Sequence, residues 1–467
     1  MIRSEETICA PATAIGSAVA IVRVSGSKSL DICEKIFFPA DKNIKLTDQK
    51  GFTIQFGEIR SGEEIVDEVL LSVFRSPLSY TGENSAEISC HASPYIVKMI
   101  LELLIKNGAV TAKPGEFTQR AFMNGKIDLS QAEAVADVIA STNRAAHKVA
   151  VNQMRGGFSD EIGRLRFKLL NFASLIELEL DFGEEDVEFA DRNDLKSIIL
   201  SVKDLADRLT NSFSLGNAVK NGIPVVIIGK PNSGKSTLLN ALLNEEKAIV
   251  SDIPGTTRDT IEDTITIDGL AYRFIDTAGL HDTADIIETM GIKKTHEKIS
   301  QASIILLIDE ISDSPESINK RIRAIREMIK ESDKKLIIII NKCDKSQPGQ
   351  IEKLTQKISL DENEILLFIS AKEKTGLEEL RLTLGEEVLK EKLNLNNVII
   401  TNIRHYEALL HVSESLDRVL TGLDNKMPED LIAIDIRQAI HYLGEITGQI
   451  TSDEILGNIF KNFCIGK

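Results

Sequence analysis

The chain has 467 residues, 42% of them hydrophobic, which predicts about two to four globular domains. Lysine plus arginine total 55 and aspartate plus glutamate total 71, so the formal net charge is −16. This charge excludes a general binder of polyanions, and any nucleic acid has to be held by a local basic patch or by a partner protein.

The cysteines and the apolar runs indicate the compartment. The five cysteines are scattered without a C-x-x-C pair, a pattern typical of a reducing compartment with neither a zinc site nor a disulfide framework. The first residues have no apolar signal core, and no run approaches the ~18 residues of a membrane span. We therefore expect a cytoplasmic protein with no membrane association.

The N-terminal segment, residues 1–124, is predicted to be a small α+β domain. Alternating or apolar runs predict strands, and the spacing of apolar residues over 96–105 predicts a helix that ends at an Asn-Gly pair. Nothing in this segment identifies a chemistry by itself. Arg23, Glu87 and Lys126 are isolated charges, for which the default prediction is a surface position.

Residues 125–220 are predicted to be helical. Ser130 and Glu133 have the spacing of a capping box, and apolar residues at helical spacing follow them. Two further helices are predicted over 165–180 and 195–209, with an acidic run between them that is more typical of a solvated loop than of a site. Helical hairpins with little β signal favour a bundle.

A buried strand at 225–229 leads into a G-x-x-x-x-G-K-S motif and then into a helix. This order is the context that a phosphate-binding loop requires, because the glycines let successive N–H groups surround phosphate oxygens at a helix N-terminus. Lys235 is expected to reach the terminal phosphates and Ser236 to bind Mg²⁺. The remaining loop residues predicted to bind nucleotide are Asn232, Ser233, Gly234 and Thr237.

Two loops that respond to the terminal phosphate are predicted next. The first contains two hydroxyls and comprises Ser251, Asp252, Ile253, Pro254, Gly255, Thr256 and Thr257. A hairpin with its turn at Asp268-Gly269 follows. Its second strand runs into the second loop, in which an Asp can hold the Mg²⁺ water shell and a Gly can turn its N–H toward the γ-phosphate. These residues are Asp276, Thr277, Ala278 and Gly279.

The base is predicted to be guanine. A buried strand ends in the N-K-x-D motif of Asn341, Lys342 and Asp344, whose carboxylate can accept two N–H groups from the guanine edge. The next strand leads to Ser370, Ala371 and Lys372, whose backbone is expected to contact the guanine oxygen. In this order, the motifs predict a GTPase.

Leu280 stands directly after the D-x-A-G motif, where many small GTPases place a glutamine that orients the attacking water. An aliphatic side chain cannot hydrogen-bond that water, so either hydrolysis is slow or another group acts. The candidates in the same loop are His281, Asp282, Asp285 and Glu288, of which Glu288 is favoured. No arginine finger can be named.

Residues 386–467 are predicted to form three more helices, one of them capped through Thr451 and Glu454. We expect these helices to rejoin the first helical stretch as one bundle, with the GTPase domain inserted between its two halves. The predicted domains are therefore 1–124, 125–220, 221–385 and 386–467.

The whole chain resembles one family, the MnmE (TrmE) tRNA-modification GTPases. The resemblance rests on motifs that are more specific than those shared by all GTPases. They are Tyr80–Glu83, Lys113–Thr118, Asn124–Leu129, Gln131–Ala134, Asp181–Asp186, Asp276–Leu280, Leu443–Gly448 and Phe463–Lys467. The stretches 10–16 and 90–93 are less glycine-rich than the family pattern.

The resemblance implies an N-terminal domain that forms a homodimer and binds a one-carbon tetrahydrofolate, in the 5-formyl or 5,10-methylene form. The residues that match the family's folate contacts are Arg23, Glu87, Lys126 and Lys467, and Cys464 matches the tail cysteine needed for the modification. The implied partner is an FAD protein, MnmG (GidA), in a heterotetramer. Together they are expected to add an aminomethyl or carboxymethylaminomethyl group to C5 of the wobble uridine of certain tRNAs.

The resemblance also implies how GTP is hydrolysed without glutamine or arginine. A potassium ion takes the place of an arginine finger when two GTPase domains meet. Its implied ligands are the side chains of Asn232 and Thr256 and the carbonyls of Ser251 and Ile253, and Glu288 orients the water. Thr257 and Ser236 complete the Mg²⁺ shell.

Two other functions compete with this prediction. A switch GTPase for ribosome assembly would bring an appended RNA-binding module and a basic surface, and neither is visible in a chain of charge −16. A folate-binding scaffold with a degenerate GTPase domain is the second alternative. The intact Lys235, Ser236, Thr257 and Asp276 argue against it.

Overall fold

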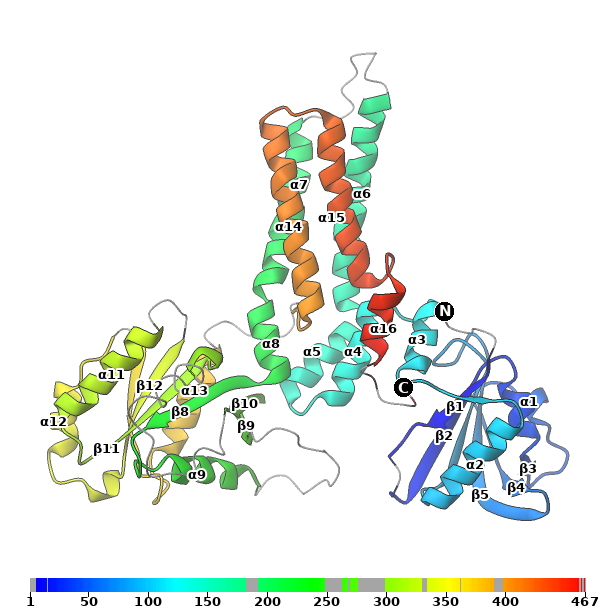
Figure 1. Cartoon of the computed structure of the whole chain (residues 1–467), viewed down its shortest axis with the longest axis horizontal. Helices are drawn as coiled ribbons and strands as arrows, with labels where there is room; N and C mark the ends of the chain where they lie inside the picture. Colours follow the sequence, from blue (N-terminus) through cyan, green and yellow to red (C-terminus); the bar gives the residue numbers. More distant parts are fainter. Residues whose placement is uncertain are drawn as a thin grey trace. The chain divides into compact units, whose positions relative to one another are not determined.

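A computed structural model of the chain describes residues 6–14, 16–181, 192–247, 263–267, 269–275, 299–329, 334–361, 363–389, 398–461, 463 and 466. The chain divides into two compact units (Figure 1). One comprises residues 1–139, 151–208 and 407–467, and the other comprises residues 140–150 and 209–406.

Among the described residues, the first unit contains a seven-stranded sheet in the order β3-β4-β5-β6-β2-β1-β7. All neighbours are antiparallel except β1 and β7. Helices α1 (Ser29–Glu34) and α2 (Pro94–Lys106) contribute buried side chains to its core. The strands are β1 (Ile8–Pro11), β2 (Val19–Ser25), β3 (Phe37–Pro39), β4 (Thr53–Ser61), β5 (Glu64–Phe74), β6 (Ser85–His91) and β7 (Val110–Thr111), and η1 (Leu46–Asp48) is a 3₁₀ turn.

The rest of the first unit is helical. Helix α15 packs against α6, and Lys203 of α7 contacts Ser413 and Asp417 of α14, so early and late segments of the chain form one bundle (Figure 1). The helices are α3 (Glu116–Met123), α4 (Leu129–Ala140), α6 (Gly157–Asp181), α7 (Arg192–Asn211), α14 (Ile403–Asp424), α15 (Glu429–Thr447) and α16 (Asp453–Lys461).

Two predicted helix caps were wrong. Helix α4 is capped by Asp128, whose carboxylate accepts the N–H of Gln131 at 2.9 Å, while the Gln131 side chain accepts the N–H of Asp128 at 2.9 Å. Ser130 lies inside the helix and bonds Ser159 instead. Asp128–Gln131 and Ser130–Glu133 both have the spacing of a capping box. Asp128 caps the helix because it directly precedes the first helical residue, Leu129. In α16 the hydroxyl that accepts the N–H of Ile455 belongs to Ser452 rather than Thr451.

The second unit is built on a sheet in the order β13-β12-β11-β8-β10-β9. The apolar runs of β8, β11 and β12 are buried on both faces, as expected for parallel strands covered by helices. β9 and β10 form the predicted hairpin. The strands are β8 (Ile223–Gly229), β9 (Asp263–Ile267), β10 (Leu270–Phe274), β11 (Ile304–Glu310), β12 (Lys335–Asn341) and β13 (Glu364–Phe368).

The helices of the second unit pack on this sheet. They are α5 (Arg144–Met154), α8 (Phe213–Asn221), α9 (Lys235–Lys247), α11 (Pro315–Ile329), α12 (Gln350–Lys357) and α13 (Leu377–Leu389), with a 3₁₀ turn η3 (Cys343–Lys345). One of its cores includes Ala145, Val149, Val219 and Ile399, and the N–H of Ala145 donates to Gly269 O at 3.2 Å. The carboxyl ends of β8, β11, β12 and β13 meet at one edge, which is where such sheets bind ligands.

The predicted combination of an N-terminal α+β domain, a helical domain and an α/β nucleotide domain is confirmed at this level. Within the described ranges, no helix is both long and apolar enough to cross a membrane.

Candidate functional site

The loop between β8 and α9 is closed by two glycines that have no room for a side chain. A Cβ on Gly229 would lie 2.3 Å from the carbonyl oxygen of Ile308. Gly234 has a φ of +100°, and a Cβ there would lie 2.2 Å from Nδ2 of Asn341. The loop can therefore approach both the β11 strand and the β12 terminus only with glycine at these positions.

Lys235 and Ser233 give this loop its polar character. The Lys235 amino group donates to the carbonyls of Gly229 at 3.0 Å and Lys230 at 2.9 Å, and burial lowers its pKa. The side chain of Ser233 is fully buried, and among the described residues its hydroxyl has no hydrogen-bond partner. An ammonium group, an unsatisfied hydroxyl and the N-terminus of α9 together fit a phosphate group.

Asn232 adopts a left-handed backbone conformation, with φ +63°. Its carbonyl accepts a hydrogen bond of 2.7 Å from the amino group of Lys342, which also forms an ion pair of 2.8 Å with Glu310. Lys342 is itself left-handed, with φ +65°. This contact holds the phosphate loop and the N-K-x-D motif together, and the Asn232 residue remains exposed.

Asp344 lies next to Ser370, whose hydroxyl donates to the Asp344 carboxylate at 2.6 Å. This hydrogen bond holds the pKa of Asp344 below its usual value, so the carboxylate is charged at neutral pH. Asn341 donates to Ser233 O and accepts the N–H of Ala371, which brings the two predicted base-binding motifs to the phosphate loop.

The other predicted residues divide into two groups. Thr237 is exposed, and Lys372 is exposed with its amino group 3.2 Å from Glu373. Several predicted residues lie outside the described ranges: Ser251, Asp252, Ile253, Pro254, Gly255, Thr256, Thr257, Asp276, Thr277, Ala278, Gly279, Leu280, Glu288, Cys464 and Lys467.

The sequence reasoning missed an ionic support of the phosphate loop. Lys230 forms an ion pair with Asp313, which also contacts Arg321 of α11 at 3.0 Å. Arg321 Nε lies 2.7 Å from the fully buried carboxylate of Asp309 at the end of β11. Burial raises the pKa of Asp309, and Arg321 counters the rise. In the sequence, the acidic residues of 309–316 simply precede the basic residues at 320 and 321, which does not indicate which of them pair.

A second polar site lies in the first unit. Arg23 of β2 and Glu87 of β6 are directly opposite in the ladder, and Arg23 Nε donates to the Glu87 carboxylate at 2.9 Å. Arg23 Nη1 also donates to the carbonyl of Gly466 at 3.2 Å. The prediction of isolated surface charges was wrong for these two residues, because strand pairing joins positions far apart in the sequence.

The C-terminal tail reaches this site through Gly466. Its φ is +93°, and a Cβ there would lie 2.1 Å from the carbonyl oxygen of Pro11. Lys126 is exposed, and its amino group donates to the carbonyl of Pro77 at 3.0 Å. The three described residues matching the family's folate contacts thus belong to one unit.

Two aromatic rings complete the surroundings of Arg23. The guanidinium carbon lies 5.4 Å from the centroid of the Tyr80 ring and 5.6 Å from that of Phe117. Contacts of this kind stabilise a cation. Both aromatic residues occur in motifs that carry the family resemblance, but their proximity to Arg23 could not be read from spacing.

The glycine loop after β8, with N-K-x-D at the end of β12 and S-A-K after the end of β13, lies at the carboxyl edge of parallel strands and defines a P-loop protein that binds guanine nucleotides. A family model described as "GTP-binding protein TrmE N-terminus" matches residues 7–126, and one described as "MnmE helical domain" matches residues 129–464. The chain therefore belongs to the MnmE family of tRNA modification GTPases.

Full-length relatives agree with this assignment. The "tRNA modification GTPase MnmE" of Bacteroides thetaiotaomicron is 51% identical, covering 99% of this chain and 100% of its own. That of Flavobacterium psychrophilum is 52% identical, covering 99% of each chain. A solved GTP-binding protein from Sulfolobus solfataricus is 18% identical, covers 49% of this chain and 68% of its own, and has a TM-score of 0.26, which is too low to carry an argument.

Proposed function

We propose that this protein hydrolyses GTP in a potassium-dependent manner to drive modification of C5 of the wobble uridine in certain tRNAs. The observation that carries the proposal is the junction of Ser233, Asn341 and Ala371, which joins a phosphate loop to guanine-selective motifs. The relatives of about 50% identity over nearly the whole chain are tRNA modification GTPases.

In the nucleotide unit, Lys235 binds the terminal phosphates, and in the structure its amino group donates to two carbonyls of the same loop. Ser236 and Thr257 hold Mg²⁺, and Asp344 binds the guanine edge. Mg²⁺ supplies charge neutralisation at the phosphates when bound. Ser236 is the second residue of α9, directly after the phosphate loop.

A potassium ion would take the place of an arginine finger, and another residue would orient the attacking water because Leu280 cannot hydrogen-bond it. Asn232, Thr256, Ser251 and Ile253 hold the ion, and Glu288 orients the attacking water. Asn232 supports this assignment because it is exposed, and its left-handed backbone is held by Lys342. When bound, potassium supplies positive charge that stabilises the transition state.

The N-terminal unit binds a one-carbon tetrahydrofolate through Arg23, Glu87, Lys126 and Lys467, with Cys464 acting in the modification. The ion pair of Arg23 and Glu87 and the approach of Gly466 support a shared site. The protein works in the cytoplasm as a homodimer with an MnmG-like FAD protein. Its domains are 1–124, 125–220, 221–385 and 386–467.

An ion exchange tests the hydrolysis mechanism. GTP turnover is expected to rise severalfold when sodium is replaced by potassium, and Asn232→Ala is expected to flatten that response. Asn240→Ala is the matched control, because Asn240 is an exposed asparagine on α9 outside the loop. Equal turnover of the wild-type protein in both salts would remove potassium from the mechanism.

Mass spectrometry of tRNA nucleosides tests the wider function. Cells that lack the protein are expected to lose the C5 substituent of the wobble uridine. Unchanged nucleosides in those cells would favour the alternative, a switch GTPase for ribosome assembly.

A further inference from the structure

Two side chains proposed to bind folate contact one short segment, residues 77–87, and a third belongs to it. Arg23 lies over the Tyr80 ring, and Lys126 donates to the carbonyl of Pro77 at 3.0 Å. Glu87 ends the segment on strand β6, opposite Arg23. The position of this segment therefore determines how all three side chains are arranged.

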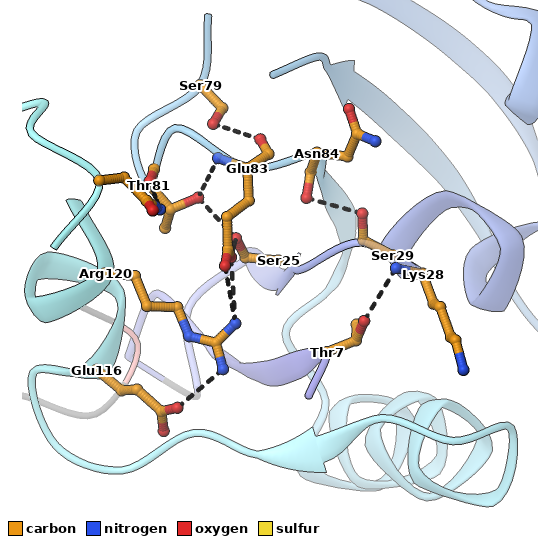
Figure 2. Close-up of polar contacts among 11 residues, drawn as sticks. Thr7, Ser25, Lys28, Ser29, Ser79, Thr81, Glu83, Asn84, Glu116 and Arg120 are labelled. Atoms are coloured by element: carbon orange, nitrogen blue, oxygen red, sulfur yellow. Dashed lines mark hydrogen bonds and ion pairs between the residues drawn. The ribbon is translucent and has the colours of Figure 1, made fainter. Parts of the chain in front are cut away.

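A chain of hydroxyl groups ties this segment to β2 (Figure 2). Ser25 is fully buried, and its hydroxyl donates to the Glu83 carboxylate at 2.7 Å. Because that carboxylate only accepts, the single proton of Ser25 is used there, and the Thr81 hydroxyl must donate to Ser25 across 2.7 Å. Thr81 in turn accepts the N–H of Glu83 at 3.3 Å.

Glu83 is held from the other side by Arg120 of α3. Nη1 of Arg120 donates to both Glu83 oxygens at 3.2 Å, and Nη2 donates to Glu116 at 3.0 Å. The Arg120 side chain is 3% exposed, against 18% for Glu83. Figure 2 shows both carboxylates pointing toward the guanidinium group. The pair is thus nearly removed from water.

Further contacts fix the rest of the segment. The Ser79 hydroxyl donates to Glu83 O at 2.5 Å, and Asn84 O accepts the N–H of Gly26 at 3.0 Å. Tyr80 shares a hydrogen bond of 2.8 Å with the buried hydroxyl of Thr118, also on α3. Helix α3 therefore holds both the Glu83 side chain and the ring that faces Arg23.

Stability alone does not account for this ion pair. Desolvating two charges offsets most of their attraction, so well-packed apolar residues of the same size would often serve equally well. What this ion pair adds is direction, because Arg120 is held between two carboxylates, with Nη1 on Glu83 and Nη2 on Glu116. Glu83 also accepts a hydrogen bond from Ser25 of β2, and Thr118 of the helix that carries Arg120 is hydrogen-bonded to Tyr80.

We propose that Glu83 and Arg120 are positioning residues for the folate site, acting by holding Tyr80 against Arg23. This inference rests on the proposed folate binding. Tyr80 then also belongs to the folate site, where α3 supports it. It was not among the folate contacts predicted from the family resemblance.

Calorimetric titration of the full-length protein with 5-formyltetrahydrofolate tests the proposal. Glu83→Gln keeps the shape of the side chain but removes its charge, and it is expected to weaken binding by about tenfold or more. Asp67→Asn is the control, because Asp67 is a carboxylate of β5 with 7% of its side chain exposed, paired with His91 at 2.7 Å. Its folate affinity and the GTP turnover of both variants are expected to equal those of the wild type.

A double-mutant cycle separates positioning from a merely structural role. If Glu83 acts through Arg23, adding Glu83→Gln to Arg23→Lys costs about twofold or less, whereas a general loss of structure makes the two effects multiply. Multiplying effects, or wild-type affinity in Glu83→Gln, would overturn the proposal.

If Glu83→Gln does not fold, Ser25→Ala removes a single hydrogen bond to the same carboxylate, and it is expected to weaken binding severalfold. Unchanged affinity in Ser25→Ala would then overturn the proposal. A wild-type protein that binds no folate would overturn the proposed folate function and this inference together, whereas normal wild-type binding with unaffected variants overturns only the inference.

Discussion

The side-chain amide of Asn341 donates to the carbonyl of Ser233 at 2.9 Å, and the Asn341 side chain is the link between the base-binding and phosphate-binding parts of the nucleotide unit. Its oxygen accepts the N–H of Ala371 at 3.0 Å. Asn341 is 2% exposed, so these bonds do not compete with water.

Asn341→Ala is expected to lower the affinity for GDP by about tenfold or more, because each buried group left without a partner costs about 1–3 kcal/mol. A titration with fluorescent GDP measures this. Asn319→Ala is a matched control, since Asn319 also makes two bonds, to Lys357 O at 2.9 Å and Ser359 N at 3.0 Å, but on an exposed surface of α11 and α12. Equal losses in both variants would contradict the linking role.

Ser370→Ala is expected to move the acid limit of GDP binding to higher pH. The Ser370 hydroxyl lowers the pKa of Asp344, so the charged carboxylate persists into acid and guanine binding is lost only as pH falls through that lowered pKa. Without the hydroxyl, the pKa returns toward about 3.9 and binding is lost earlier. GDP affinity measured against pH checks this, and an unchanged acid midpoint would refute it.

The described cysteines are expected to resist alkylation in the native protein. Burial raises the pKa of Cys9, Cys90 and Cys343 to about 11 and the pKa of Cys33 to about 12. At pH 8 only about one thiol in a thousand is then ionised and nucleophilic. We expect iodoacetamide to leave Cys9, Cys33 and Cys90 unlabelled in the native protein, as read by peptide mass spectrometry with a denatured control. Rapid native labelling of Cys33 would be inconsistent with its burial.

Two glycine substitutions are expected to change the free energy of unfolding in opposite directions. Gly448 ends α15 with a φ of +82°, and a Cβ there would lie 2.7 Å from Phe122 and 2.8 Å from Leu129. Gly448→Ala should therefore destabilise the protein by about 1–3 kcal/mol. Gly457 lies inside α16 with open space around it, so Gly457→Ala should stabilise the helix by up to about 1 kcal/mol. Urea unfolding of both variants measures these changes. Destabilisation by Gly457→Ala would contradict the expected gain in helix stability.

Features that depend on local sequence were predicted well. The apolar runs of β8, β11 and β12 are strands, because burial on both faces leaves a continuous apolar signature. The N-K-x-D and S-A-K motifs could be assigned to strand ends for the same reason. The helix at 96–105 was found within two residues at each end, since proline and an Asn-Gly pair bound it.

The joining of the early and late helices in one bundle was predicted, but particular side-chain contacts between distant residues were not. The spacing from Arg23 to Glu87 in the sequence does not predict their ion pair, because it forms only when β2 and β6 pair. The pairing of Glu83 with Arg120 joins a loop to a helix, and that of Lys230 with Asp313 joins two loops. Several acids in each region could have served. The misplaced cap of α4 has a different cause, because two overlapping capping patterns were present and only geometry chooses between them.

The packing of Ala145 and Val149 into the nucleotide core has a practical consequence for dissecting the protein. A gene fragment that encodes only residues 221–385 omits these side chains, as well as Val219 and Ile399, and would leave an uncovered apolar surface beside the β9–β10 hairpin. Biochemists who express the GTPase portion alone should expect aggregation or altered turnover that says little about the intact enzyme. Adding a peptide of residues 140–150 in trans would restore Ala145 and Val149 to the apolar core.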